Sequence, residues 1–357
     1  MELRKDAKYD LLIPTSMGVR ITPEENVPVH IARNYRMQST SAESNVGSTS
    51  AALGKRVKIL TRFVKDSPVS YFIKSDLRRR NMEYEGLDMP QGGPWGYRHQ
   101  FNIADCGSGI RAPRVWNDRA GEVGRTISLD DFDIDRLLVD EGAKFIHFSG
   151  LFVSMSHETA EFCEAFAQKA QENGTKICFD LNYRASFWKN REKELSRVFR
   201  NVAGIADILV GNEEDFQLAL GMEGPEAGGM GIQEKIDGFK GMIDATRKRF
   251  PNVEIYGTTL REVVSANQHL WGAILCDKGK WHTVDQKPIG VTDRIGGGDG
   301  FVGGLLYGLL NGWDSEKCLQ FAWATGALAT TVGEDYYTPY SEEEIWRAWS
   351  GNVRVVR

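Results

Sequence analysis

The chain has 357 residues, of which 41% are hydrophobic and 26% are charged, and its formal net charge is −5. This composition is typical of a globular protein with ample material for a core, and the acidic balance argues against a general binder of nucleic acids or anionic membranes. No run approaches the ~20 apolar residues of a transmembrane helix, and no secretory hydrophobic region follows Met1. The sequence therefore predicts a soluble, cytoplasmic protein with one large α/β domain or two ordinary ones.

Five cysteines are scattered along the chain, and no two of them form a Cys-x-x-Cys pair. They are predicted to be reduced thiols, so neither a disulfide framework nor a zinc site is indicated. The cysteines lie at positions 106, 163, 178, 276 and 318.

The N-terminal part predicts two strands separated by a helix. Residues 9–13 are apolar and form the first predicted strand, which Pro14 closes. Arg20, in the stretch that follows, is interpreted as a solvated loop arginine in preference to a substrate contact. Residues 39–54 are small and polar and then helical, and residues 57–64 form the second predicted strand.

Residues 91–128 differ from their surroundings, because short strand-like pieces are interrupted by Gly and Pro and carry many arginines. Strands that cannot bury two faces fit a small sheet that covers a cleft better than they fit a central sheet. About three of the arginines are expected to be solvated, whereas at least one is a candidate for holding a carboxylate in a bidentate pair of hydrogen bonds. The arginines concerned are Arg98, Arg111, Arg114, Arg119 and Arg125.

From residue 144 the pattern alternates between strands and helices. Strands are predicted at 145–150, 176–182 and 205–211, and a helix is predicted over 156–172, which indicates a parallel sheet with crossover helices. His147 lies inside an apolar run and is interpreted as a core histidine in preference to a catalytic one. Ligands of such sheets collect at the carboxyl ends of the strands. The polar residues at those ends are Asp180, Asn182, Arg184, Asn212 and Asp215.

The following segment predicts further strands and a helix. Residues 221–237 are predicted to form a loop, and residues 253–261 a strand that runs into a polar turn. Residues 267–275 and 280–283 suit an antiparallel pair, and residues 318–331 a helix of small side chains.

Residues 291–310 carry the strongest functional signal. Three consecutive glycines, Gly296 to Gly298, are followed by Asp299 and then by an apolar helix that itself contains glycines. Glycine costs roughly 1 kcal/mol against alanine inside a helix, so these glycines indicate a close approach of another part of the chain. Bare amides at a helix N-terminus form an anion hole for a phosphate, and an adjacent aspartate suits removal of a proton from an attacking hydroxyl. The alternative is a glycine-rich turn before a buried helix.

Residues 293–299, Asp-Arg-Ile-Gly-Gly-Gly-Asp, resemble the C-terminal signature Asp-Thr-x-Gly-Ala-Gly-Asp of the ribokinase-like (phosphofructokinase-B-type, or PfkB) carbohydrate kinases. Arg294 and Gly297 replace the usual Thr and Ala. The resemblance implies an α/β, three-layer Rossmann-type fold with a mostly parallel central sheet and a small β-sheet lid. It implies one kinase domain over residues 1–357, with lid segments at approximately 14–36 and 91–128.

Further segments resemble the sugar kinases of this family. Residues 39–54 are similar to the motif Gly-Gly-Ala-x-x-Asn-x-Ala, with Asn45 at the sugar-binding asparagine and with Thr40 and Ser41 in place of the glycines. Residues 180–184 are similar to the Asp-x-Asn-x-Arg segment of 2-keto-3-deoxygluconate kinases. That likeness places Arg184 between sugar and nucleotide and Asn182 near the phosphates; alternatively, Arg184 pairs with a local acid.

The resemblance also implies the metal and substrate contacts. Residues 212–215 resemble the family's Asn-x-x-Glu motif, which organises Mg²⁺ largely through water, with Asp215 one methylene shorter than the usual Glu. Residues 117–121 align with a Tyr-Tyr-Arg-x-Gly stretch, which puts Arg119 on a substrate carboxylate. The implied substrate contacts are Ser41, Asn45, Asn117, Arg119, Arg184 and Asp335, and the implied ATP contacts are Asn182, Arg184, Thr258 and Arg261.

These features predict an ATP-dependent kinase in which Asp299 is the general base and the amides of Gly296, Gly297 and Gly298 form the anion hole. The favoured substrate is a sugar acid, 2-dehydro-3-deoxy-D-gluconate or a related compound. The alternatives are a kinase for a neutral sugar or nucleoside and a non-catalytic sugar sensor. A dinucleotide oxidoreductase is disfavoured, because the glycines do not follow the first strand. Pairing of two lids would cover their free edges, so a homodimer is expected.

Overall fold

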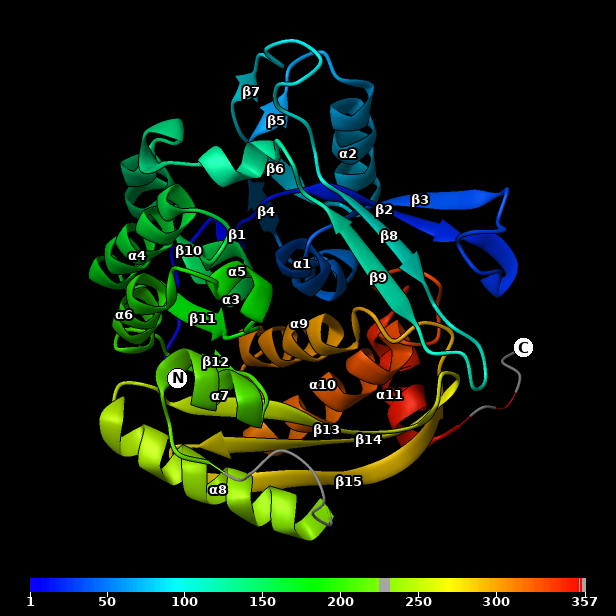
Figure 1. Ribbon diagram of the computed structural model, residues 1–357. Coiled ribbons are helices and arrows are strands. Elements are labelled where there is room, and N and C mark those ends of the chain that lie inside the picture. The colour runs from blue at the N-terminus through cyan, green and yellow to red at the C-terminus, as the bar shows by residue number, and fades with distance from the viewer. Residues whose placement is uncertain (225–231, 353, 355–357) are drawn as a thin grey trace.

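The computed structural model describes residues 1–224, 232–352 and 354. A central sheet of nine strands divides the molecule (Figure 1). All neighbouring pairs from β13 to β6 are parallel, and β14 and β15 add an antiparallel edge, which confirms the predicted mostly parallel sheet. In spatial order the strands are β15 (Lys280–Gly290), β14 (Gln268–Asp277), β13 (Ile255–Ser265), β12 (Ile208–Val210), β11 (Lys176–Asp180), β10 (Ala143–Ser149), β1 (Tyr9–Pro14), β4 (Val57–Leu60) and β6 (Glu83–Glu85).

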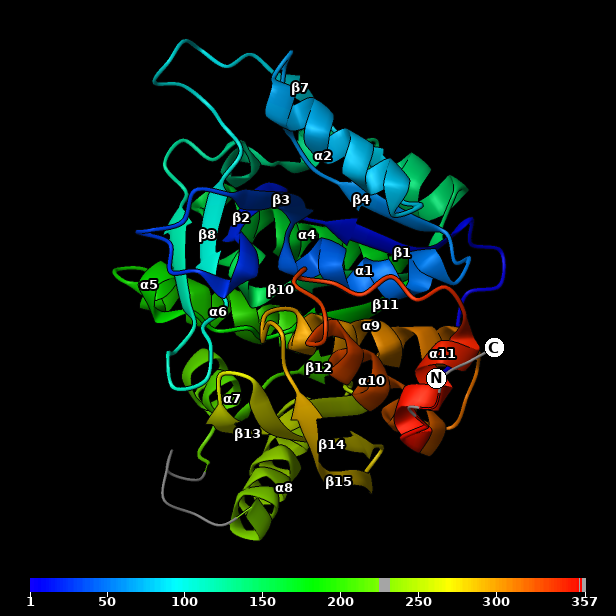
Figure 2. The ribbon, with the colours of Figure 1, turned by 90° about the vertical axis from the view of Figure 1, so that its right-hand side faces the viewer.

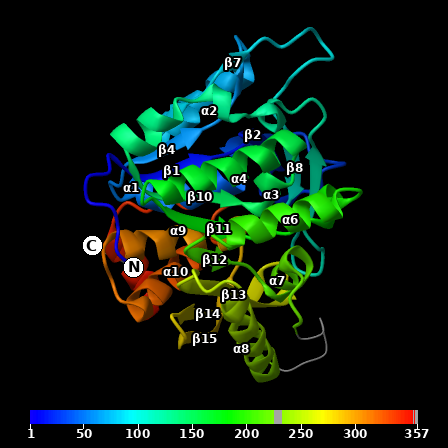
Figure 3. The same ribbon diagram turned by 90° about the vertical axis from the view of Figure 1, so that its left-hand side faces the viewer.

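Helices cover both faces of this sheet. Figure 3 shows α4 (His157–Glu172) and α6 (Glu192–Ala203) on one face, the side of α7 (Glu213–Leu220) and α8 (Ile232–Arg249). Figure 2 shows the opposite face, with α1 (Ala42–Ala52), α9 (Gly297–Leu310), α10 (Ser315–Ala329) and α11 (Glu342–Ser350). The remaining helices are α2 (Pro68–Arg79), α3 (Gly150–Val153) and α5 (Ala185–Trp188).

The central strands bury side chains on both faces, as parallel strands between helical layers must. On β1, Tyr9 and Leu12 pack into the core of the α4 side, whereas Leu11 and Ile13 pack into the core of the α1 side. His147 on β10 is 1% exposed, which agrees with its interpretation as a core histidine. The alternating strands and helices together form the predicted three layers.

The glycines of α9 allow close helix packing. A Cβ at Gly303 would lie 2.5 Å from the carbonyl oxygen of Val46 in α1, and a Cβ at Gly304 would lie 2.0 Å from Oγ1 of Thr325 in α10. Neither contact is sterically allowed, so the predicted close approach is present. It holds α9 tightly between α1 and α10.

A second sheet of four strands forms the lid (Figures 1 and 2). Its order is β3 (Tyr35–Thr40), β2 (Gly18–Pro23), β8 (Phe101–Asp105) and β9 (Arg114–Asp118). The β2–β8 pair is parallel and the two outer pairs are antiparallel. The short strands β5 (Phe63–Val64) and β7 (Asp88–Met89) form a third, two-stranded sheet.

Two predicted boundaries are wrong. The strand predicted over 57–64 is broken, because β4 pairs with β6 in the central sheet whereas β5 pairs with β7. Of the loop predicted over 221–237, residues 232–237 belong to α8, where Ile236 and Phe239 lie on its buried side. Residues 225–231 of that loop lie outside the described residues. In the described part of the chain, no helix is long and apolar enough to cross a membrane.

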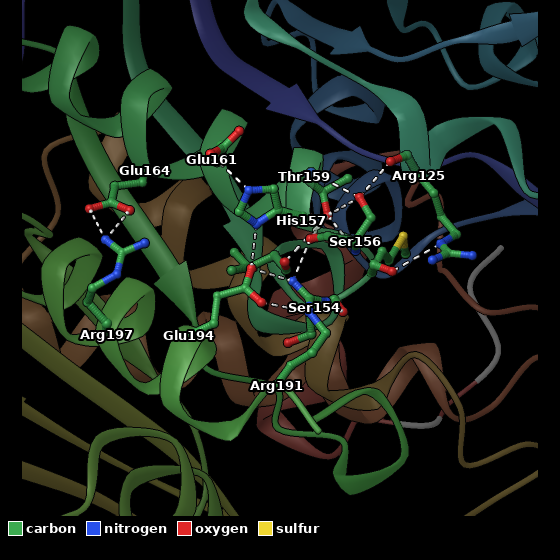
Figure 4. Close-up of polar contacts among 12 residues, drawn as sticks. Arg125, Ser154, Ser156, His157, Thr159, Glu161, Glu164, Arg191, Glu194 and Arg197 are labelled. Atoms are coloured by element: carbon green, nitrogen blue, oxygen red, sulfur yellow. Dashed lines mark hydrogen bonds and ion pairs between the residues drawn. The ribbon is translucent and has the colours of Figure 1, made fainter. Parts of the chain in front are cut away.

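The chain between β10 and α4 is fixed by residues at the start of α6 (Figure 4). Arg191 donates from Nη1 to the carbonyl oxygen of Ser154 at 2.7 Å and from Nη2 to that of Ser156 at 2.8 Å. The same guanidinium binds both carboxylate oxygens of Glu194, and Nδ1 of His157 lies 3.0 Å from Glu194 Oε1. This network ties the segment after a central strand to the neighbouring crossover helix.

Candidate active site

A cleft of about 1210 Å³ lies between the central sheet and the lid. Its walls include Asp180 and Val210, at the carboxyl ends of β11 and β12, and Asn102 and Asn117, on lid strands β8 and β9. The carboxyl ends of parallel strands are where ligands bind in open α/β sheets. All of the predicted contact residues except Gly297 line this cleft: Ser41, Asn45, Asn117, Arg119, Asn182, Arg184, Asn212, Asp215, Thr258, Arg261, Gly296, Gly298, Asp299 and Asp335.

The N-terminus of α9 opens into the cleft. Gly296 is the N-cap at φ 83°, and a Cβ there would lie 1.8 Å from the carbonyl oxygen of Asp335, so only glycine fits. The amide of Gly300 donates to the carbonyl of Gly296, which leaves the amides of residues 297–299 without a partner inside the helix. Amides of this kind, backed by the helix dipole, are suited to bind a phosphate.

Gly297 lies behind the cleft surface, which explains its departure from the family's alanine. A Cβ at this position would lie 3.0 Å from Cγ2 of Thr330 and 3.3 Å from the ring of Trp271. The neighbouring Gly298 has nothing within 4 Å of the same position. Gly297 is therefore a packing residue as well as a carrier of one of the amides.

Asp299 lies in the first turn of α9, partly open to the cleft. Its Oδ2 accepts a hydrogen bond of 2.9 Å from Nδ2 of Asn45. Burial raises the pKa of Asp299 to about 7, and the charges of Asp335 and Glu43 act in the same direction, whereas the Asn45 hydrogen bond and the charge of Arg184 oppose the shift. A carboxylate with a pKa near neutrality is well matched to general-base catalysis.

Arg20 is buried, so its interpretation as a solvated loop arginine is wrong. Its side chain is 1% exposed and forms ion pairs with Asp293 and with Asp335. Burial lowers the pKa of Arg20, but the two carboxylates outweigh this effect and raise it above the usual value. The arginine lies on lid strand β2, and both of its partners lie more than 270 residues further along the chain.

Thr40 and Ser41, which replace the family's glycines, have hydroxyls that are already engaged. Thr40 donates to Oδ2 of Asp335 at 2.6 Å and lies 3.4 Å from Nδ2 of Asn45. Ser41 caps α1, because its Oγ accepts the amide of Ser44 at 3.0 Å. Thr40 and Ser41 thus place hydrogen-bonded side chains on the floor of the cleft, at the positions where the family motif has glycines without side chains.

Arg119 lines the cleft, but one edge of its guanidinium is already paired. Nη1 donates to both carboxylate oxygens of Glu122, at 3.0 and 3.1 Å, and the side chain is 15% exposed. Nε is buried and has no partner among the described residues. Arg184 donates to the carbonyl of Tyr183 at 2.7 Å and has no ion pair with a described acid, which disfavours the alternative that it pairs locally.

Four buried amide oxygens in the cleft have no partner in the described part of the chain, and the fourth, of Asn182, is described below. The first three belong to Gln100, which directly precedes lid strand β8, to Asn102 on that strand and to Asn45 on α1. An unsatisfied buried acceptor costs free energy unless a ligand supplies a donor. Hydroxyl groups of a sugar supply such donors. Sequence reasoning missed Gln100 and Asn102, because nothing in their local pattern shows which way β8 faces.

The other end of the cleft carries further cations and an unpartnered amide oxygen. Oδ1 of Asn182, a residue at φ 34°, is buried without a partner in the described structure. Arg261 lines the cleft and is exposed to solvent there; partial desolvation lowers its pKa to about 10, and the charge of Arg294 adds to this effect. Thr258 is 2% exposed. Arg294, which replaces the family's threonine, also lines the cleft and was not predicted as a contact.

Asn212 and Asp215 form a reciprocal cap at the start of α7. Asn212 Oδ1 accepts the amide of Asp215 at 3.0 Å, and Asp215 accepts the amides of Asn212 and Tyr183, both at 2.8 Å. Burial, followed by the charges of Asp215 and Asp299, raises the pKa of Asp180 well above its usual range. Both carboxylate oxygens of Asp215 accept backbone amides, and their remaining lone pairs can accept hydrogen bonds from the water shell of a hydrated Mg²⁺.

The layered sheet, the lid and the amide-lined helix start beside Asp299 together define a ribokinase-like carbohydrate kinase. The sequence profile of the pfkB family carbohydrate kinases matches residues 126–340, so the chain belongs to this family.

Similar proteins act on related compounds. A 2-dehydro-3-deoxygalactonokinase of Haloferax volcanii is 28% identical over 343 residues, which cover 94% of this chain and 96% of that protein. A 5-dehydro-2-deoxygluconokinase of Clostridium perfringens is 24% identical and covers 92% of this chain and 89% of its own. The crystal structure of 2-dehydro-3-deoxygluconokinase from Thermotoga maritima superposes with a TM-score of 0.86 at 26% identity, over 96% of this chain and all of that one.

Proposed function

We propose that this kinase transfers the γ-phosphoryl group of ATP to a hydroxyl of a dehydro-deoxy sugar acid, with 2-dehydro-3-deoxy-D-gluconate and its 6-phosphate as the favoured pair. The observation that carries the proposal is the set of unpartnered acceptors of Asn45, Gln100 and Asn102, which share one cleft with Asp299 and with the arginines at positions 119 and 184. Acceptors suit the hydroxyls of a sugar, and arginines suit its carboxylate. The names of the three similar kinases describe substrates of this one class.

Asp299 is the proposed general base. Its carboxylate would accept the proton of the attacking hydroxyl, while the amides of residues 297–299 would hold the negative charge on the transferred phosphoryl group. Because the pKa of Asp299 is raised to about 7, the base is half ionised near neutral pH. Activity is therefore expected to rise with pH through this value.

Arg119 and Arg184 are the proposed carboxylate contacts. The buried Nε of Arg119 has no described partner and is available as a donor when the side chain adjusts to a ligand. Ser41, Asn117 and Asp335 would complete the sugar end of the cleft, since all three line it.

The nucleotide end would be formed by Asn182, Arg184, Thr258 and Arg261. When bound, Mg²⁺ would neutralise charge on the ATP phosphates. Asp180, Asn182 and Asp215 supply the oxygens that suit its hydration shell, and Asn212 fixes Asp215.

A neutral sugar or a nucleoside is the second candidate substrate. The pairing of Arg119 with Glu122 favours it, because this buried acid already balances one of the two cations that would receive a carboxylate. A non-catalytic sensor would bind sugar without releasing ADP.

An ADP-release screen separates these candidates. Purified protein is offered ATP, Mg²⁺ and a panel of dehydro-deoxy sugar acids, fructose, ribose and adenosine, with Asp299→Asn as the blank. We expect turnover on the acids to exceed turnover on the neutral compounds at least tenfold. Equal or better use of fructose, ribose or adenosine would contradict the sugar-acid assignment.

We further propose that residues 1–357 act as one kinase unit that dimerises through its lid in the cytoplasm. The edge strand β9 exposes Val115 and Trp116, so a second lid would cover apolar surface as well as free backbone groups. All five cysteines are free and buried, which fits a reducing compartment. Light scattering of the wild type and Trp116→Glu tests the dimer, since the variant should be monomeric.

A further inference from the structure

Arg20 joins the lid to two separate segments beside the catalytic carboxylate. It is the one charged residue of lid strand β2, its side chain is buried, and it pairs with Asp293 and Asp335. Arg20 does not line the cleft, so it is not a substrate contact. A role in the reaction must act through its two partners.

Asp293 links Arg20 to the loop that leads into the anion hole. Its Oδ1 accepts the amide of Ile295 at 3.1 Å, which shapes the turn just before Gly296. Its Oδ2 accepts from Arg20 and from Sγ of Cys106, which follows lid strand β8, at 3.0 Å. Two lid segments thus converge on one carboxylate of the phosphate-binding loop.

Asp335 links Arg20 to the catalytic base. Arg20 binds Oδ1 of Asp335, and Thr40 donates to Oδ2 at 2.6 Å. Asn45 then lies between Thr40, at 3.4 Å, and Asp299, to which it donates at 2.9 Å. The result is a continuous polar chain from the lid arginine to the carboxylate that would deprotonate the substrate.

The energetics of this arrangement favour a functional explanation. Burying an ion pair costs several kcal/mol in desolvation, and well-packed apolar residues often serve stability equally well. A guanidinium presents several donors in a fixed plane, so one side chain can fix two carboxylates at a defined separation. The contribution of Arg20 is therefore the fixed relative position of Asp293 and Asp335.

We infer that Arg20 is a positioning residue for phosphoryl transfer, which sets the anion-hole loop through Asp293 and the base through Asp335, Thr40 and Asn45. The inference rests on the proposed role of Asp299. It implies that the position of the lid and the alignment of the base are coupled, because Arg20 lies on lid strand β2 and binds the two carboxylates that position the loop and the base.

The test uses two variants that keep the buried charges, one that removes the charge of Arg20, and a matched control. Thr40→Val removes the hydroxyl between Asp335 and Asn45 and keeps the shape of the side chain. Thr22→Val is the control, since Thr22 lies on β2, is 2% exposed and has a hydroxyl with no described partner. Arg20→Lys keeps the positive charge but loses the planar set of guanidinium donors, and Arg20→Met removes both the charge and the donors.

Two readouts are measured for each variant. The first is kcat and KM on the best substrate of the panel. The second is the pKa of the Asp299 carboxyl by ¹³C NMR, which requires no turnover and is assigned with Asp299→Asn. The charged groups that act on Asp299 are Asp335, Glu43 and Arg184, with Asp180 across the cleft; all are retained in every variant.

We expect Thr40→Val and Arg20→Lys to lower kcat at least tenfold and to raise the Asp299 pKa by about half a unit or more, because the donor from Asn45 is less well held. Thr22→Val should match the wild type in both readouts. Unchanged kcat and pKa in folded Thr40→Val and Arg20→Lys would overturn the inference, as would the same losses in Thr22→Val. Should the wild type phosphorylate no compound of the panel, the proposed function fails, and the NMR readout still decides on the coupling.

Discussion

The hydrogen bond from Asn45 to Asp299 lets us predict how the pH profile of activity changes when the donor is removed. Asn45→Leu removes the donor and keeps an apolar side chain of similar size at a position that is 4% exposed. A hydrogen bond to a charged group contributes about 1.5–3 kcal/mol, and 1.36 kcal/mol corresponds to one pKa unit. Loss of the donor disfavours the ionised form of Asp299, so its pKa is expected to rise from about 7 by roughly 1–2 units.

The assay is the pH profile of kcat/KM between pH 5.5 and 9.5, because this ratio reports the ionisation of the free enzyme. Loss of a sugar contact by Asn45 lowers the whole profile but does not move the position of its acidic limb. Asn201→Leu is the matched control, since Asn201 donates to the carboxylate of Glu164 at 2.6 Å on the surface of α6, far from the cleft residues. An Asn45→Leu limb at the wild-type position, or below it, would refute the assignment of Asp299 as the base.

Four further predictions follow from the described contacts. Asp299→Asn should lower kcat by ~10²–10⁴-fold. Because the folded pKa of Asp299, about 7, exceeds the reference value of 3.8, wild-type stability should fall as pH rises from 3.8 to 7 and level off above 7, and denaturant titration should show this fall absent from the variant. Arg119→Met should raise KM for a sugar acid ~10–100-fold and leave KM for a neutral sugar nearly unchanged. Gly297→Ala should lower the melting temperature, whereas Gly298→Ala, with open space at Cβ, should not. Arg191 lowers the pKa of Glu194 from 4.5 to about 2, so Glu194→Gln should lower the free energy of unfolding by ~0.5–1 kcal/mol at pH 7. Thermal melts should show that this difference between wild type and variant disappears as the pH falls from 4.5 toward 2.

Local sequence patterns predicted the central sheet and the glycine-rich start of α9, because both depend on residues that are neighbours in the chain. Alternating apolar runs and helical periods specify strands and crossover helices, and the position of each strand end then places Asn182 and Asp215 at one edge of the sheet. The glycines before Asp299 likewise report on their own backbone, at φ 83° for Gly296. Such features can be predicted from the sequence without knowledge of the tertiary fold.

Arg20 illustrates what local patterns do not contain. Its partners lie 273 and 315 residues away, and β2 is covered on both faces, so the alternation of side chains along the strand carries no signal. A different signal was available: Asp293 matches the first acid of the family's signature and Asp335 was an implied substrate contact, and two buried carboxylates close together require a cation. An arginine of the lid can supply this cation. Counting the charges that gather at the assembled site would therefore have favoured a buried, paired Arg20 over a solvated one.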